Sequence, residues 1–87
     1  RLGLIESAIY PNPARDQANL YLNSEREQAV SIRITDISGR LMYQSESTWI
    51  SGKTNLALPI GQLAAGMYLV EVHGTTGSIH KKLQVNR

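Results

Sequence analysis

The dominant pattern along this chain is an alternation of apolar and polar residues with a period of two. It is clearest at residues 30–34, and it recurs at residues 18–22, 56–58 and 68–72. Such alternation is typical of β-strands that bury one face. No segment keeps the i, i+3, i+4 apolar spacing of an amphipathic helix beyond two turns. The sequence therefore predicts an all-β protein.

Clusters of Gly, Pro, Asn, Asp and Ser separate these patterns at short intervals, as turns do. We therefore expect about seven strands, at residues 4–10, 18–23, 28–36, 40–46, 54–58, 67–73 and 78–86. Short strands with turns about every 8–12 residues are typical of an immunoglobulin-like antiparallel β-sandwich. Its predicted core includes Val30, Ile32, Ile34, Tyr68, Val70 and Leu83. Residues 47–53 carry no clear pattern, and Trp49 fits either the core or the surface.

The length of 87 residues suits one domain, 1–87. The chain starts at Arg1 without an initiator Met, so we expect a C-terminal domain excised from a longer protein. It has no cysteine and only 2 histidines, so neither a disulfide nor a cofactor or metal site is predicted. No stretch approaches the ~20 apolar residues of a transmembrane helix.

Charge is distributed unevenly. The chain has 9 Lys and Arg against 7 Asp and Glu, a net charge of +2, which is too small to indicate a nucleic-acid partner. Residues 72–87 contain Lys81, Lys82 and Arg87 and no acidic residue, so they hold +3 and leave −1 on the rest. The basic character belongs to the last strand.

Two motifs are explained by turn chemistry. The segment Tyr10-Pro11-Asn12-Pro13 is a stiff corner, because each proline fixes φ and favours an extended residue before it. The segment Asp36-Ile37-Ser38-Gly39-Arg40 has Asp and Gly at the first and fourth positions of a type I turn. Both are interpreted as structural.

The segment Leu63-Ala64-Ala65-Gly66-Met67-Tyr68 is typical of a tyrosine corner. In that motif a tyrosine near the start of a strand buries its ring and donates its hydroxyl to a backbone carbonyl upstream. Gly66 would supply the tight turn.

The final hairpin has a predictable register. A turn centred on Thr75 and Thr76 pairs Glu71 with His80, Val70 with Lys81 and Tyr68 with Leu83. Lys81 then lies on the apolar face, where a charge is costly. It must extend to the sheet edge, mark a bulge or take part in recognition.

Catalysis is not supported by the residues present. The chain has no cysteine, no Gly-rich phosphate loop and no serine placed with a histidine and an acid. We therefore predict a protein that is not an enzyme. A terminal strand is more suited to recognition, for instance by addition to a partner's sheet.

Taken together, four motifs resemble the C-terminal sorting domain of Bacteroidetes type IX secretion substrates. They occur in that family's order over almost the whole chain, as Tyr10-Pro11-Asn12-Pro13-Ala14, Asp36-Ile37-Ser38-Gly39-Arg40, Leu63-x-x-Gly66-x-Tyr68-x-Val70 and Lys81-Lys82-Leu83-x-Val85.

The resemblance implies a signal that crosses the periplasm with an upstream cargo and reaches the cell surface or the medium. Its implied partners are the outer-membrane type IX translocon and a sortase-like peptidase that usually removes the domain and attaches the cargo. Some members are retained, and the sequence leaves that choice open. The residues implied in translocon recognition are Gly66, Tyr68, Lys81, Lys82, Leu83, Val85 and Arg87.

Two other functions stay open. An immunoglobulin-like accessory module would bind carbohydrate or a partner domain, but Tyr10, Tyr21, Tyr43 and Trp49 form no obvious aromatic ladder. A spacer would have no ligand at all. Loss or retention of secretion on deleting the domain distinguishes both from a sorting signal.

Overall fold

A computed structural model describes residues 3–87 and contains six strands. They are β1 (Leu4–Tyr10), β2 (Ala18–Asp36), β3 (Leu41–Gln44), β4 (Thr48–Leu58), β5 (Gly66–His73) and β6 (Ser78–Val85), with one 3-10 turn, η1 (Ile60–Gln62), before β5. The prediction of an all-β protein is confirmed. Within residues 3–87 no helix has the length and apolar character to cross a membrane.

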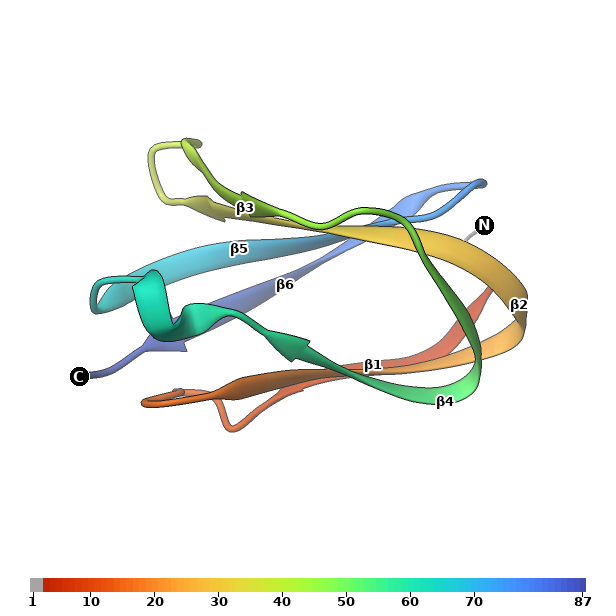
Figure 1. The fold of residues 1–87 in the computed structure, drawn as a ribbon, viewed down its shortest axis with the longest axis horizontal. Helices are drawn as coiled ribbons and strands as arrows, with labels where there is room; N and C mark the ends of the chain where they lie inside the picture. The colour runs from red at the N-terminus through yellow and green to blue at the C-terminus, as the bar shows by residue number, and fades with distance from the viewer. Residues whose placement is uncertain (1–2) are drawn as a thin grey trace.

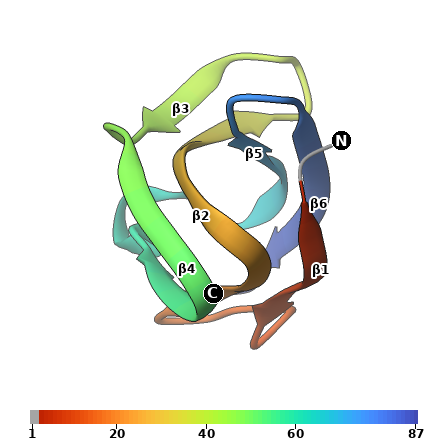
Figure 2. The same cartoon turned by 90° about the vertical axis from the view of Figure 1, so that its right-hand side faces the viewer.

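Strand β2 belongs to both layers of the domain. Its first half pairs with β1 and β4, and its second half pairs with β3 and β5, which in turn pairs with β6. All these pairings are antiparallel. Figures 1 and 2 show the result, in which β2 bends at one end and the two layers face each other. This arrangement is compatible with an immunoglobulin-like sandwich.

The predicted strands 18–23 and 28–36 are one strand, so six strands replace the expected seven. Asn23-Ser24-Glu25 is not a turn, because Ser24 and Gln28 are buried at the bend and are hydrogen-bonded to each other. The Gln28 side-chain amide donates to Ser24 Oγ at 3.0 Å, and the Ser24 hydroxyl donates to the Arg26 carbonyl at 2.6 Å. The chain bends there, and the pairing with β4 shifts register between Ser24 and Gln28.

Two other strand boundaries differ from the prediction. Strand β4 starts at Thr48 rather than at residue 54, and β3 covers 41–44 rather than 40–46. The uncertain segment 47–53 is therefore mostly strand, because β2 pairs with it on both sides of the bend, at residues 23–24 and again at residues 28–30. Trp49 lies on the surface with 73% of its area exposed, while the next residue, Ile50, is buried.

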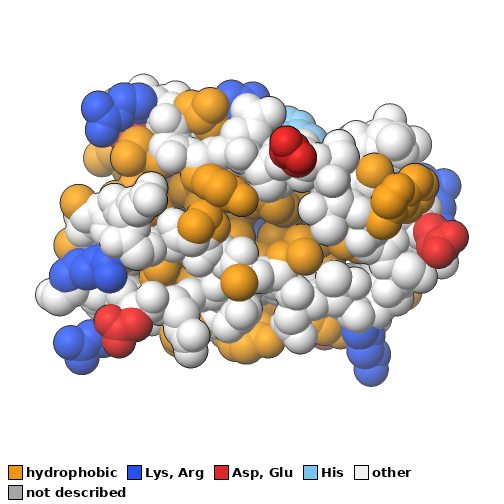
Figure 3. Space-filling model, in the orientation of Figure 1, with side chains coloured by type: hydrophobic (Ala, Val, Ile, Leu, Met, Phe, Trp, Pro, Cys, Tyr) orange, Lys and Arg blue, Asp and Glu red, His pale blue; other side chains and the backbone are white. Residues whose placement is uncertain are grey.

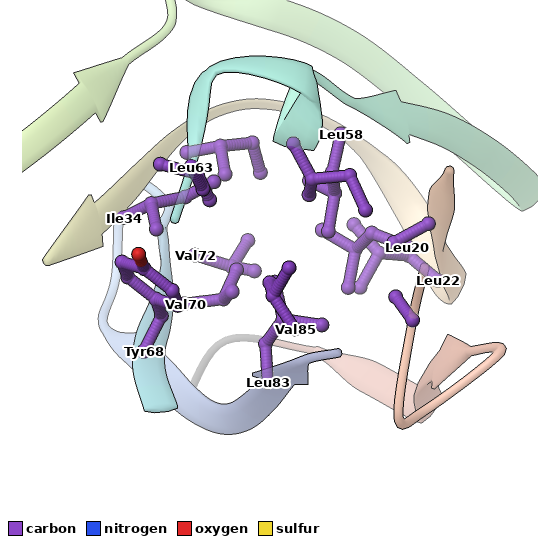
Figure 4. Packing of buried hydrophobic residues seen from close by; sticks show 14 of the residues in the cluster. Leu20, Leu22, Ile34, Leu58, Leu63, Tyr68, Val70, Val72, Leu83 and Val85 are labelled. Carbon is purple, nitrogen blue, oxygen red and sulfur yellow. The ribbon is translucent and has the colours of Figure 1, made fainter. Parts of the chain in front are cut away.

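The core lies between the two layers and is continuous. All six core residues named from the sequence are buried. Figure 4 shows Leu83 and Val85 of β6 pointing into the same interior as Leu20 and Leu22 of β2. In Figure 3 apolar side chains are visible along the middle of one face, and most charged side chains lie toward its ends and rims. The C-terminal strand is thus an integral part of the core.

The turn between β2 and β3 is fixed by Asp36. Its carboxylate accepts hydrogen bonds from the Ser38 hydroxyl at 2.6 Å and from the amides of Ser38 and Arg40 at 2.9 Å. The Gly39 amide donates to the Asp36 carbonyl, as expected of the type I turn. The Ser38 hydroxyl, as the largest cause, and the amides of Arg40 and Ser38 hold the pKa of the Asp36 carboxyl below its ordinary value.

Candidate recognition surface at the C-terminal strand

The predicted tyrosine corner is present at the start of β5. The Tyr68 hydroxyl donates to the Ala64 carbonyl at 2.6 Å, and the side chain is buried among core residues. Gly66 has a φ of 156°. Both residues therefore have a structural role at the start of β5. Their predicted contact with a translocon stays a prediction.

Replacing Gly66 with Val should lower the free energy of unfolding by about 1–3 kcal/mol, because a β-branched residue resists that backbone conformation. Urea denaturation measures the change. Gly61→Val is the matched control, since Gly61 does not have a positive φ and no atom lies within 4 Å of its added Cβ. Equal stability of the two variants would show that the backbone conformation at residue 66 accepts a side chain without strain.

The register predicted for the final hairpin is confirmed, with Glu71 opposite His80, Val70 opposite Lys81 and Tyr68 opposite Leu83. The β5–β6 ladder has no bulge between its first pair, Gly66 with Val85, and its last pair, His73 with Ser78. Lys81 is half-buried beside Val70, so its aliphatic stem lies along the apolar side. We infer that its ammonium group extends to the sheet edge, as lysines at such positions do.

Strand β6 divides the predicted recognition residues between two faces. Leu83 and Val85 are fully buried, at 0% and 1% exposure, and pack in the core. Lys82 is exposed on the opposite face, where it pairs with Leu69. Of the residues predicted on this strand, Lys82 is therefore the one that the fold presents fully to a partner.

Arg87 lies just beyond β6 and anchors the end of the chain. Its guanidinium donates to the carbonyls of Arg15 at 2.7 Å and of Leu63 at 2.8 Å, and also to the carbonyl of Ile60. These contacts join the end of β6 to η1 and to the loop after β1. The sequence offered no local signal for them, because the acceptors are backbone groups from distant segments.

The outer edge of β6 is closed by the Tyr10–Ala14 corner. The Asn12 side-chain amide donates to the Lys82 carbonyl at 2.9 Å, and its oxygen accepts from the Gln84 amide at 3.0 Å. Ala14 continues the pairing, because its amide donates to the Gln84 carbonyl and its carbonyl accepts from Asn86. The expectation of strand addition is therefore wrong for the backbone from Lys82 to Asn86, which is already paired.

A row of outward side chains crosses the β3-β2-β5-β6 layer near its end. Leu41 pairs with Thr35, Thr35 with Leu69, and Leu69 with Lys82. Beside this row is a shallow hollow of about 300 Å³, lined by Asp36, Ile37, Met67, Tyr68, Leu69 and Lys82. We call Ile37, Leu41, Met67, Leu69 and Lys82 the outer-face patch.

The outer-face patch contains residues that the sequence analysis did not place at a site. Ile37 is 87% exposed, and Leu41 and Met67 are 45% and 41% exposed. The turn that carries Ile37, the start of β5 and the end of β6 lie at the same end of the domain, on the left in Figure 1. Apolar residues next to a turn are common in strands, so the sequence pattern did not distinguish them from core positions.

Farther along the same layer, Glu71 lies between two histidines. His80 Nε2 is 2.9 Å from one Glu71 oxygen, as the predicted cross-strand pair requires, and His73 Nε2 is 3.7 Å from the other. Within residues 3–87 no three His, Cys, Asp or Glu side chains are arranged to hold a metal ion. This part of the face thus holds exposed polar contacts between histidine and glutamate side chains, and exposed contacts of this kind contribute little to stability.

Comparison with known proteins agrees with the motifs. The family model described as the secretion system C-terminal sorting domain matches residues 8–86. No curated protein sequence matches the chain. The matched residues run from β1 to just past the end of β6, so they include the edge-closing corner, the Asp36 turn, the tyrosine corner and the basic last strand. The chain therefore belongs to the family of C-terminal sorting domains, the non-catalytic signals of type IX secretion.

Proposed function

We propose that this domain carries an upstream cargo through the outer membrane because the type IX translocon recognises side chains on the outer face of β5 and β6. The observation that supports this most is the position of Lys82. Its neighbours Leu83 and Val85 hold the strand in the core, and the edge backbone is paired to Asn12 and Ala14. Of Lys81, Lys82 and Arg87, only Lys82 is exposed on the sheet face, because Lys81 is half-buried and Arg87 lies beyond the end of β6.

The shape of the domain suits a signal joined to a cargo. The domain is about 36 Å long, and β1 begins at the end opposite the outer-face patch (Figure 1). A cargo joined before β1 would leave the patch accessible to the translocon. We propose that the pair crosses the periplasm and reaches the cell surface or the medium, where a sortase-like peptidase cuts before β1 and attaches the cargo.

The test is Lys82→Glu in a reporter fused ahead of this domain, in a host with a working type IX system. Reversing an exposed charge should change stability by at most ~0.5 kcal/mol, yet we expect export to slow severalfold because the partner now meets the wrong charge. Lys53→Glu is the matched control, since Lys53 is an exposed strand lysine in the other layer.

Two results decide the proposal. Normal export of Lys53→Glu with slow export of Lys82→Glu, both with unchanged melting, supports recognition at β6. Full surface delivery of Lys82→Glu would refute it. Removing residues 81–87 should trap the reporter in the periplasm. That variant also loses core residues, so it serves only to show what complete loss of export looks like in the assay.

A further inference from the structure

We infer that the outer-face patch is a side-chain docking site for a segment of the translocon in which an apolar residue stands beside an acidic one, with Ile37 as its apolar anchor. The inference rests on the proposed function and deepens it, because it names the surface and the chemistry of the partner. It extends recognition beyond the basic last strand to a turn some 45 residues earlier in the chain.

Neither the fold nor turn chemistry explains Ile37. Four hydrogen bonds to Asp36 already fix the turn: from the Ser38 hydroxyl and the amides of Ser38, Gly39 and Arg40. None of them involves the Ile37 side chain. A β-branched apolar residue is not among the residues that favour turns, and at 87% exposure it adds almost nothing to the core. The rigid turn therefore holds an apolar side chain out toward solvent.

The surroundings of Ile37 make a site rather than a single exposed residue. Single surface apolar residues are common, whereas a contiguous group marks an interaction surface. Met67 and Leu69 line the same hollow as Ile37, and Leu41 lies in the same cross-strand row, separated from Leu69 by Thr35. The hollow is open and about 300 Å³ in volume, so it can accept an apolar side chain of a partner between Ile37 and β5.

The charges around the patch favour an acidic neighbour for that side chain. Lys82 lines the hollow, and its charge has no acidic counterpart in the lining, because Asp36 pairs with Arg40 at 3.5 Å in the adjoining turn. The one carboxylate in the lining, Asp36, is occupied by the turn donors. A partner that places an apolar side chain in the hollow would therefore gain from a carboxylate opposite Lys82. Because the β6 edge is closed, this partner docks through side chains and not as an added strand.

The experiment compares export of a reporter fused to the wild-type domain and to the variants Ile37→Ser and Ile5→Ser. Ile5 is the matched control, because it is an isoleucine exposed by 64% in β1 of the other layer. Both variants should shift the melting temperature by less than about 4 °C. We expect Ile37→Ser to slow surface delivery about tenfold, the usual effect of losing an interface anchor, and Ile5→Ser to match the wild type.

A second pair of variants tests the charge of the partner. With an acidic partner, Ile37→Asp should be exported more slowly than Ile37→Lys, although both lose the apolar contact. The reverse order, or equal rates for all Ile37 variants and the wild type, overturns the inference. Sedimentation of the purified domain tests whether the patch binds a second copy of the domain instead. A dimer that the Ile37→Ser substitution dissociates would show that it does, and would overturn the inference.

These outcomes separate this inference from the proposed function. If the wild-type domain does not export the reporter at all, the proposed function fails and the inference falls with it. If the wild type and Ile37→Ser are exported equally while Lys82→Glu is slow, the sorting role stands and the docking site is wrong.

Discussion

Replacing Leu83 with Ala should lower the free energy of unfolding by about 2–5 kcal/mol, the usual cost of such a cavity. Leu83 is fully buried and pairs with Tyr68 across the β5–β6 ladder. A domain of 87 residues has a stability of about 4–13 kcal/mol, so the variant should lose a large share of it. Urea denaturation measures the loss, and Gln84→Ala, an exposed neighbour, should change stability by at most ~0.5 kcal/mol.

The same position tests whether Leu83 is recognised directly. Leu83→Met conserves volume and should cost less than about 1.5 kcal/mol. If Leu83 acts through the fold, Leu83→Met restores export to the wild-type rate while Leu83→Ala abolishes it. Slow export of a stable Leu83→Met variant would instead show that the translocon contacts this side chain. A loss below ~1 kcal/mol for Leu83→Ala would contradict the packing of β6.

Replacing Arg87 with Met should lower the free energy of unfolding by about 1–3 kcal/mol. Methionine keeps the apolar stem but loses the charge-assisted hydrogen bonds to the carbonyls of Arg15, Ile60 and Leu63. We expect the amides near the end of β6 to exchange hydrogen faster, because the strand is then tied only by its ladder and by the Asn12–Ala14 contacts.

Arg40→Met is the matched control for this second prediction. The Arg40 guanidinium makes an ion pair with Asp36 at 3.5 Å, and its side chain is 74% exposed. Such pairs contribute about 0–1 kcal/mol, so this variant should be nearly as stable as the wild type. Equal losses in the two variants would show that Arg87 does not anchor the end of the chain. Reduced export of a stable Arg87→Met variant would support its predicted role in recognition.

Interactions between near neighbours in the chain were predictable from the sequence. The period-two pattern identified β5 to within one residue, and the turn at 75–76 set the register of the final hairpin. The Asp36 turn and the tyrosine corner, which closes over 4 residues, follow from local chemistry as well. The same register placed Lys82 on the outer face. In each case the two partners are separated by a short segment with few conformations.

Only the tertiary structure decided the features whose partners are far apart in the sequence. Strand β2 runs through residues 24–28 because β4 and a buried Ser24–Gln28 contact replace the expected turn. Asn12 closes the edge of β6 from 70 residues away, and Arg87 reaches Leu63 from 24 residues away. The outer-face patch likewise unites a turn with two later strands. Alternation specifies which face of a strand is buried, but the position of each strand in the sheet depends on packing of the whole chain.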